Sequence, residues 1–237
     1  MSKFRRILLK LSGESLSGTN GLGIDGGMLK AYVDEIKSVY EKSVEVCVVL
    51  GGGNIFRGVQ GLERGIDRVQ GDYMGMLATI INSLALKSAL ENDGIKATVL
   101  SGLVVDPLCQ RMSRERALSL ISQGHVVIIS GGTGNPYFTT DSAAALRAIE
   151  VGADVLLKGT RVDGVFSADP EKDPTAVKYS ELTYDQVYEK NLKVMDLTAI
   201  TLCKENNLPI IVFDVNRKGN LKEIVLEGKG NGTLVRN

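Results

Sequence analysis

The sequence predicts an α/β fold, a three-layer sandwich in which helices cover both faces of a central, mostly parallel sheet. Short runs of β-branched and aliphatic residues alternate along the chain with longer segments whose apolar residues recur at helical spacing. This alternation is typical of parallel strands joined by crossover helices, and such sheets are buried on both faces. The chain shows no linker, internal repeat or low-complexity tract. We therefore expect residues 1–237 to form a single domain.

The expected strands are short apolar runs that end at turn residues, and two of them carry a lysine near the end. In chain order they are Arg6–Leu11, Val44–Leu50, Ala97–Leu100, Leu103–Val105, Val126–Ile129, Ala153–Lys158, Ile210–Asp214 and a short strand at the C-terminus.

The expected helices lie between these strands and show apolar residues three and four positions apart. In chain order they are Met28–Lys42, Asp72–Glu91, Arg114–Gln123, a helix through Ala143–Leu146, Leu182–Lys190, Asp196–Asn206 and Leu221–Leu226. Asp141 or Ser142 is expected to cap the fourth helix. The pair Asp163-Gly164 is a turn signal and predicts a short hairpin over Val162–Ala168.

The segment Val126–Arg147 contains a buried strand, a glycine-rich loop and the start of a helix, in that order. The loop reads SGGTGNPYFTTD and has no bulky side chain near its start. Small residues admit an anion close to the backbone, and the N–H groups and dipole of a helix N-terminus favour negative charge. The segment therefore predicts a phosphate site at the end of this strand.

Composition excludes several classes of protein. Lys plus Arg and Asp plus Glu both total 28, and this zero net charge disfavours a protein that mainly binds nucleic acid. The three cysteines form no CxxC motif and the only histidine is His125, so a zinc site is not expected and the thiols are expected to be reduced, as in the cytoplasm. His125 precedes a buried strand and is interpreted as a satisfied, partly buried residue. No signal peptide and no membrane-spanning segment of about 20 apolar residues is predicted.

Common nucleotide-binding and hydrolase motifs do not account for the glycines. There is no GxxxxGK[ST], GxSxG or HExxH sequence. Residues 21–26 match GxGxxG, but nine residues separate them from the expected end of the first strand, whereas a dinucleotide fingerprint follows its strand directly.

Lysines and glycine loops recur at the predicted strand ends, where ligands bind in sheets of this kind. Lys10 and Lys158 each end an apolar run, and glycine loops follow at Gly13, Gly51–Gly53, Gly131–Gly134 and Gly159. Phosphoryl transfer needs positive charge and N–H donors more than a covalent nucleophile, so this set of residues indicates a phosphotransferase. Of the aspartates that accompany them, Asp72, Asp141 and Asp196 are candidates for the site and also candidates for simple helix capping.

Six motifs in the same order resemble those of the bacterial UMP kinases of the amino acid kinase superfamily, and the resemblance covers almost the whole chain. The motifs are Lys10–Glu14, Gly51–Gly58, Gly71–Thr79, Gly132–Ala144, Val162–Pro170 and Lys193–Leu197. The resemblance implies an amino acid kinase-like fold and transfer of the ATP γ-phosphate to UMP, with Mg²⁺ carried by ATP and no dedicated protein site for the metal.

The resemblance also implies roles for individual residues. Lys10 and Lys158 would stabilise the transferring group, Asp141 would orient them, and Asp196 would lie near Lys10. The ATP site would be formed by Lys10, Leu11, Ser12, Gly13, Gly53, Arg57, Thr160, Phe166 and Asp169. The UMP site would be formed by Gly52, Asp72, Thr133, Gly134, Asn135, Pro136, Tyr137, Phe138, Thr139 and Thr140, with Asp72 accepting from ribose hydroxyls.

The family's assembly and regulation are further expectations. Similar enzymes are cytoplasmic homohexamers that GTP activates and UTP inhibits, and the segment linked to the GTP response corresponds to Gly18, Thr19, Asn20, Gly21, Leu22 and Gly23. Two alternatives stay open on the sequence. The chain could be another kinase of this fold, acting on a carboxylate, a carbamate or isopentenyl phosphate. It could also be a non-catalytic nucleotide sensor or storage protein, although both lysines are retained.

Overall fold

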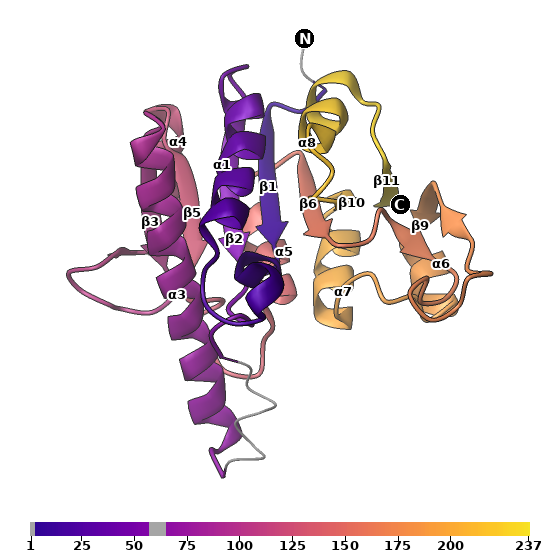
Figure 1. The fold of residues 1–237 in the computed structure, drawn as a ribbon, viewed down its shortest axis with the longest axis horizontal. Helices are drawn as coiled ribbons and strands as arrows, with labels where there is room; N and C mark the ends of the chain where they lie inside the picture. Colours follow the sequence, from indigo (N-terminus) through magenta and orange to yellow (C-terminus); the bar gives the residue numbers. More distant parts are fainter. Residues whose placement is uncertain (1–2, 57–64) are drawn as a thin grey trace.

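A nine-stranded sheet forms the centre of the molecule (Figure 1). The structure is a computed structural model that describes residues 3–56 and 65–237. Its strands lie in the order β4-β3-β5-β2-β1-β6-β10-β11-β9, and every neighbouring pair is parallel except β10 and β11. Because strands from both ends of the chain join one sheet, we propose that residues 1–237 form one domain.

The strands of this sheet are short, and those at its centre are largely buried. They are β1 (Arg6–Leu11), β2 (Glu45–Leu50), β3 (Ala97–Ser101), β4 (Gln110–Arg111), β5 (Val126–Ser130), β6 (Val155–Thr160), β9 (Glu181–Thr183), β10 (Ile210–Asp214) and β11 (Gly232–Arg236). A separate pair is formed by β7 (Val165–Phe166) and β8 (Lys178–Tyr179), which are antiparallel.

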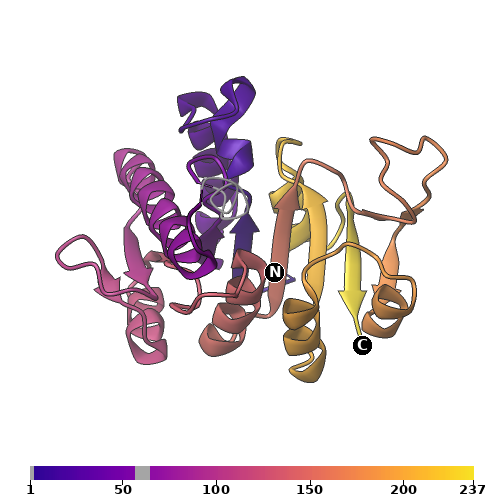
Figure 2. The same ribbon diagram turned by 90° about the horizontal axis from the view of Figure 1, so that it is seen from below.

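Helices cover both faces of the sheet, which confirms the predicted three layers (Figure 2). One face is covered by α1 (Gly26–Tyr40), α3 (Arg68–Asn92) and α8 (Asn220–Lys222) with the π-helical turn η2 (Glu223–Glu227). The other is covered by α4 (Arg114–Ser122), α5 (Thr140–Val151), α6 (Tyr184–Glu189) and α7 (Leu197–Glu205). The 3₁₀ segment η1 (Glu14–Asn20) connects β1 to α1.

Alternation along β1 divides its side chains between the two layers. Ile7, Leu9 and Leu11 belong to the apolar cluster under α1 and α3, whereas Leu8 belongs to the cluster under α5. With a period of two, Lys10 points to the same face as Leu8. The strand therefore directs the Lys10 side chain toward the layer that contains α5.

Several boundaries differ from those expected from the sequence. Helix α3 begins at Arg68 because Asp67 caps it, accepting from the N–H groups of Val69 and Gln70, so Asp72 is not a helix start. Helix α5 is capped by Thr139, whose hydroxyl accepts from the N–H groups of Asp141 and Ser142, so the prediction that one of those two residues is the cap was wrong.

Two predicted β elements are not formed as expected. Residues 103–105 are not a strand, because the chain turns at Gly102 and Val105 makes only an isolated bridge to Cys109. The hairpin predicted over Val162–Ala168 is absent, because Val165–Phe166 pairs with the distant residues Lys178–Tyr179. In addition, Glu181–Thr183 forms strand β9 before α6, where the sequence predicted helix from Leu182.

Helix α3 is long and apolar enough, by length and composition alone, to cross a membrane. This is weak evidence, because core helices of soluble proteins pass the same test. The helix carries the fully buried polar residues Asn82 and Ser83, and it packs on β3, β5 and α1. We therefore interpret α3 as a core helix.

Candidate active site

Lys10 and Lys158 lie side by side at the centre of the sheet. Strands β1 and β6 are parallel neighbours, and their register pairs Lys10 directly with Lys158. Both side chains are largely buried, with 11% and 16% of their surfaces exposed. Two ammonium groups on adjacent strands repel each other, so this arrangement requires a nearby anion.

Asp141 supplies that anion. Its Oδ1 lies 2.8 Å from the Lys10 Nζ and its Oδ2 accepts a hydrogen bond of 2.7 Å from the Lys158 Nζ. Asp141 is in the first turn of α5, where the helix dipole favours a carboxylate. The Lys158 Nζ also donates to the backbone oxygen of Val194 at 2.7 Å. We call Lys10, Asp141 and Lys158 the charged triad; it carries two positive charges and one negative charge.

The pKa of Asp141 and the pKa of Lys158 are both lowered in the triad, for different reasons. Burial by itself raises the pKa of Asp141, but the ammonium groups of Lys10 and Lys158 outweigh it and hold that pKa below its ordinary value. Burial, together with the charge of Lys10, lowers the pKa of Lys158, and Asp141 only partly offsets the shift. A net positive charge is thus concentrated at a site with little access to water.

Asp196 connects the starts of α5 and α7 beside the triad. Its carboxylate caps α7 by accepting from the Ala199 N–H at 2.8 Å, and it accepts from the hydroxyls of Thr139 and Ser142. Its negative charge also acts on Lys158, where it opposes the lowering of the pKa. The described contacts of Asp196 therefore fit helix capping, and its charge acts on Lys158.

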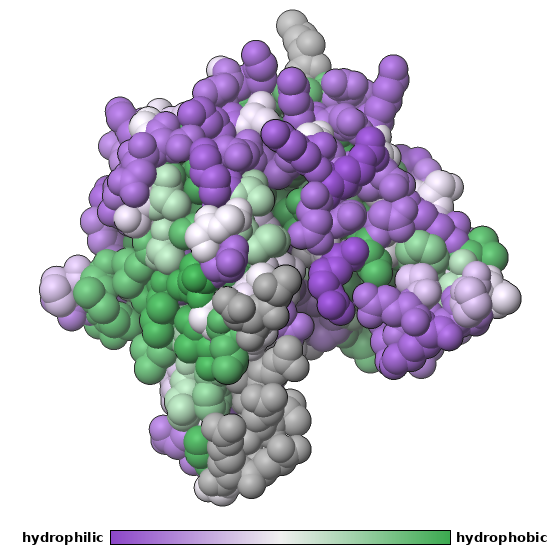
Figure 3. Space-filling model, viewed as in Figure 1, coloured by the Kyte–Doolittle hydropathy of each residue, from purple (hydrophilic) through white to green (hydrophobic). Residues whose placement is uncertain are grey.

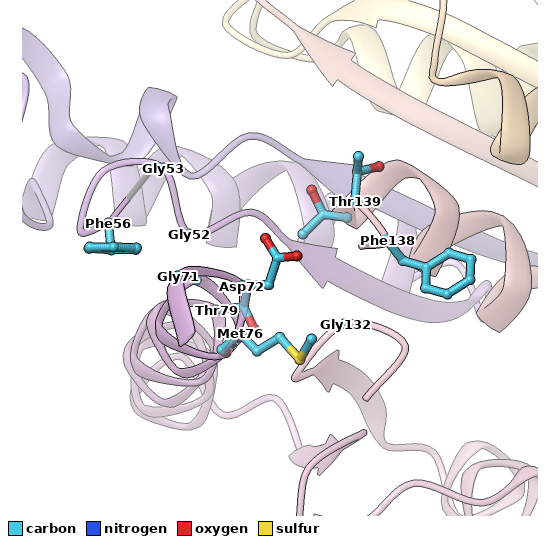
Figure 4. Close-up of a pocket in the computed structure, with 12 residues that line it drawn as sticks. Gly52, Gly53, Phe56, Gly71, Asp72, Met76, Thr79, Gly132, Phe138 and Thr139 are labelled. Carbon is cyan, nitrogen blue, oxygen red and sulfur yellow. Dashed lines mark hydrogen bonds between the residues drawn. The ribbon is translucent and has the colours of Figure 1, made fainter. Parts of the chain in front are cut away.

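A first cavity, of about 130 Å³, opens between α3 and the loops that follow β2 and β5 (Figure 4). Its lining consists of Gly52, Gly53, Phe56, Gly71, Asp72, Gly75, Met76, Thr79, Gly132, Phe138, Thr139 and Thr140. The Asp72 carboxylate points into the space between Gly52 and Thr139. The cavity therefore brings together six residues of the sequence-predicted ATP and UMP sets from three separate segments.

Asp72 already has partners in this structure. Its two oxygens accept from the Arg68 Nε at 2.9 and 2.8 Å, and one of them accepts from the Tyr137 N–H at 2.7 Å. The Arg68 guanidinium also lies 5.5 Å from the centre of the Tyr137 ring. Asp72 thereby joins α3 to the loop that precedes α5, and it also lines the cavity.

Two buried side chains that sequence reasoning missed support the loop Gly131–Gly134. The Thr79 hydroxyl of α3 accepts from the Gly131 N–H at 2.8 Å. From the opposite side, the Arg147 guanidinium of α5 donates to the backbone oxygens of Gly132 and Thr133 at 3.3 and 3.4 Å. The only signal for Arg147 was a charged residue at helical spacing from the buried Ala143 and Ala144, which is unusual on a core face.

The glycines after β1 and β2 allow two backbones to approach closely. A Cβ at Gly13 would lie 2.4 Å from the Gly51 oxygen, and a Cβ at Gly52 would lie 2.8 Å from the Ala78 Cβ. The loop is also fixed by a buried pair of amides, in which Asn54 and Asn82 bond to each other at 2.7 and 3.0 Å. Asn82 further donates to the Gly51 oxygen at 2.7 Å.

A second cavity, of about 330 Å³, lies between the segment 162–170 and the segment 190–193. Phe166 and Asp169 are among its lining residues, as is Lys193. Thr160, at the end of β6, donates to the backbone oxygen of Val162 at 2.6 Å and so fixes the start of this segment. The second cavity is larger than the first and is built largely from the chain that follows the Lys158 strand.

The charged triad connects the two cavities through the chain. Asp141 follows Thr139 and Thr140, which line the first cavity. Lys158 donates to Val194, which follows Lys193 in the lining of the second cavity. Each cavity is therefore lined by residues that are next in the chain to Asp141 or to Val194, and a pair of ammonium groups of this kind suits the transfer of an anionic group.

The other sequence-predicted residues have varied positions. The Leu11 side chain is fully buried in the core, so only its backbone could meet a ligand. Arg57 lies outside the described residues. Gly18–Gly23 lies at the end of η1, and the Gly23 oxygen accepts from the Asn54 amide at 2.7 Å. His125 is partly buried with its Nδ1 2.9 Å from the Thr98 hydroxyl, as interpreted from the sequence.

Within residues 3–56 and 65–237, no three His, Cys, Asp or Glu side chains gather in a way that could hold a metal ion.

Comparison with known proteins identifies the family. Residues 5–214 match the model of the amino acid kinase family. The chain is 59% identical to the uridylate kinase of Parabacteroides distasonis and 56% identical to that of Bacteroides thetaiotaomicron, in each case over all 237 residues and all of the relative. The chain belongs to the amino acid kinase family. The resemblance noted in its motifs is confirmed.

Solved structures agree with this assignment. This amino acid kinase superposes on the crystal structure of UMP kinase from Bacillus anthracis with a TM-score of 0.95 at 38% identity, covering 98% of this chain and 96% of the other. With UMP kinase from Ureaplasma parvum the TM-score is 0.93 at 40% identity, covering 98% and 99%. The predicted fold class is thereby confirmed as well.

Proposed function

We propose that this amino acid kinase transfers the γ-phosphoryl group of Mg–ATP to UMP, giving ADP and UDP. The observation that carries the proposal is the charged triad, in which one carboxylate holds two buried ammonium groups. The full-length identity of 59% to a uridylate kinase supports UMP as the acceptor.

In the proposed reaction, a phosphate oxygen of UMP attacks the γ-phosphorus of ATP, and the bond from that phosphorus to the β–γ bridging oxygen breaks. The ammonium groups of Lys10 and Lys158 neutralise charge on the phosphoryl oxygens during transfer, and Asp141 holds both at a fixed separation. The attacking oxygen is already anionic, so no side chain is needed as a general base. Mg²⁺ enters with ATP and shields the triphosphate.

We assign the acceptor to the first cavity and ATP to the second. The glycine-lined wall of the first cavity lets a phosphate approach backbone N–H groups, while the Asp72 carboxylate suits ribose hydroxyls because it only accepts hydrogen bonds. In the second cavity, Phe166 offers an apolar surface for a base and Asp169 offers a carboxylate for a ribose. Lys10, Ser12 and Gly13 would then face the triphosphate, whereas Gly53, placed with ATP by resemblance, lines the acceptor cavity.

Self-association is supported by an apolar area on the surface. Figure 3 shows a hydrophobic region over α3 and the neighbouring loop after β3. Its exposed residues are Tyr73, Met74, Leu77 and Ile81 on α3 and Val104 and Leu108 on the loop. Contiguous apolar surface of this kind marks a protein interface. We propose that this surface is buried between copies of the chain in a homohexamer.

Regulation and location complete the proposal. We propose GTP as an activator and UTP as an inhibitor, with residues 18–23 involved in the response to GTP. The hydrogen bond between Asn54 and the Gly23 oxygen supports this, because it joins that segment to the glycine loop of the first cavity. We propose that the enzyme acts in the cytoplasm, in keeping with its three free cysteines.

The test is a coupled assay of ADP formation with UMP, CMP, dUMP and AMP as acceptors, each with and without GTP. UMP should be the best acceptor, GTP should raise the rate, and EDTA should abolish activity. Acetylglutamate and carbamate belong in the same panel, because turnover on either of them without turnover on UMP would refute the proposal. Binding of ATP with no turnover on any acceptor would instead indicate a sensor or storage protein.

A further inference from the structure

We propose that Arg147 is a positioning residue for the acceptor, acting through the backbone of the loop Gly131–Gly134. This inference rests on the assignment of UMP to the first cavity. Arg147 is not among the residues that line that cavity, and only 7% of its surface is exposed. It therefore lies behind the loop rather than in the path of a ligand.

Burial of the Arg147 guanidinium costs free energy unless an ion pair and hydrogen bonds replace its lost hydration. Arg147 lies on the buried face of α5, among Ala143, Ala144 and Ala148, where an apolar side chain would pack without losing hydration. Glu150 pairs with one end of the guanidinium at 2.7 Å. The other end donates to the backbone oxygens of Gly132 and Thr133. Both of these bonds come from Nη2, while Nη1 pairs with Glu150, so the planar fork of arginine serves the loop and Glu150 at once, whereas lysine offers a single ammonium group.

Holding those two oxygens fixes the direction of the N–H groups in the same peptide units. In a trans peptide the C=O and N–H bonds point in opposite directions. With the Gly132 oxygen held by Arg147, the Thr133 N–H points away from the guanidinium, toward the side on which Gly132 lines the cavity. The Gly134 N–H, which belongs to the second peptide unit, donates to the Gly131 oxygen at 3.0 Å. The Thr133 N–H is thus the donor offered to the acceptor phosphate.

The loop needs this support because its own backbone is permissive. Gly131 and Gly132 have φ values of +68° and +59°, a region that glycine occupies readily and leaves readily. Thr79 fixes the peptide that enters the loop at Gly131, and Arg147 fixes the two peptides between Gly132 and Gly134. Ordering the loop before the ligand arrives removes an entropic cost from binding, and the buried positive charge behind the loop favours an anion in front of it.

The experiment compares Arg147→Met, which keeps much of the volume without the charge, with Arg147→Lys, which keeps the charge without the fork. Glu150→Gln is the matched control, because it removes the ion pair and leaves the bonds to the loop. For each variant we would measure kcat, the KM for UMP, the KM for ATP, and the rise in thermal unfolding midpoint that UMP produces. Arg147→Met should raise the KM for UMP about tenfold or more, as expected for loss of hydrogen bonds from a charged donor, with the KM for ATP nearly unchanged.

Arg147→Lys should give a smaller but still selective rise, and Glu150→Gln should leave both KM values close to wild type. Equal rises in both KM values, or an unchanged KM for UMP, would overturn the inference. If Arg147→Met does not fold, Arg147→Lys decides alone by the same criterion. A wild-type enzyme that does not turn over UMP would refute the proposed function, whereas an active wild type with unselective Arg147 variants would refute only this inference.

Discussion

At the scale of single residues, Lys158 carries the most direct prediction about chemistry. Its ammonium group is held by Asp141 and by the Val194 oxygen, so it cannot move far from the transferring group. We expect Lys158→Ala to lower kcat at least about tenfold, which corresponds to a little over 1 kcal/mol of transition-state stabilisation. Lys204→Ala, which removes a lysine in the last turn of α7 that is paired with Asp185, should leave kcat unchanged. A normal kcat in Lys158→Ala would remove this residue from the mechanism.

The same ammonium group should set the alkaline limit of activity. Burial and the charge of Lys10 lower the pKa of Lys158, so its charged form is lost at a lower pH than that of an ordinary lysine. The rate should therefore fall as pH rises through this lowered pKa. In Lys158→Arg the guanidinium stays charged, so whatever activity remains should persist to higher pH. A profile of kcat against pH checks both expectations, and identical alkaline limbs in the two proteins would contradict them.

Asp72 distinguishes ligand recognition from helix capping. The structure assigns the cap of α3 to Asp67, which leaves Asp72 free of that role. We expect Asp72→Asn to raise the KM for UMP by about tenfold, because a neutral amide is a weaker acceptor for ribose hydroxyls, and to change the KM for ATP much less. The control is Asp67→Ala, which should lower the unfolding midpoint while leaving the ratio of the two KM values as it was. A parallel loss of affinity for both nucleotides in Asp72→Asn would point to a structural role.

At the scale of elements, the sequence predicted strands better than it predicted their partners. The runs Arg6–Leu11 and Ile210–Asp214 were predicted with the bounds that the structure shows, because the sequence of a buried parallel strand is a nearly continuous apolar run. The predicted hairpin at Val162–Ala168 was wrong, because the sequence of a two-residue strand does not indicate which strand it pairs with. Here the partner is 12 or more residues away. The cap of α5 was missed because Thr139, Asp141 and Ser142 are all good capping residues, and only the fold selects one of them.

The same limit applies to the site. Lys10 and Lys158 could be found because each interrupts an apolar run, but their common partner Asp141 could be assigned only through resemblance. Arg147 and Thr79 act through hydrogen bonds to the backbone of a distant loop, and a single sequence gives almost no signal from which such bonds can be predicted.

Helix α3 is joined to the glycine loop after β2 by the buried pair Asn54 and Asn82, which gives a prediction about stability. Replacing Asn82 with Ala leaves the Asn54 amide and the Gly51 oxygen without their partners. We expect Asn82→Ala to lower the free energy of unfolding by about 1–3 kcal/mol, the usual cost of buried polar groups that lose their hydrogen bonds. Asn92→Ala, at the exposed end of the same helix, is the control and should have little effect.

A double-mutant cycle shows whether the two amides act as one unit. Once Asn82 is gone, removing Asn54 costs less, so the combined loss in Asn54→Ala with Asn82→Ala should be smaller than the sum of the two single losses. Denaturant unfolding of the four proteins measures these values. Strictly additive losses would mean that the pair does not couple α3 to the loop.

At the scale of the whole molecule, the helix layers on the two faces of the sheet contribute different features to the protein. The layer of α4 to α7 places Asp141 and Asp196 against the strand ends, whereas the layer of α1 and α3 leaves one side of α3 uncovered. On that side Leu77 and Ile81 have 46% and 49% of their surfaces exposed, next to each other on one face of the helix. The opposite side of the same helix carries Asp72 and Thr79 into the first cavity. Assembly through the exposed side would therefore hold one wall of the acceptor site.

This arrangement predicts that breaking the assembly also weakens acceptor binding. Light scattering should give the wild type a mass close to six times the 25.5 kDa chain. Leu77→Asp places a charge in the apolar surface, so it should yield smaller particles and a higher KM for UMP, while circular dichroism stays close to that of the wild type. Tyr188→Asp is the matched control, since Tyr188 is an exposed aromatic residue on α6, away from this surface. A hexameric Leu77→Asp protein, or a monomeric wild type, would show that the exposed side of α3 is not the interface.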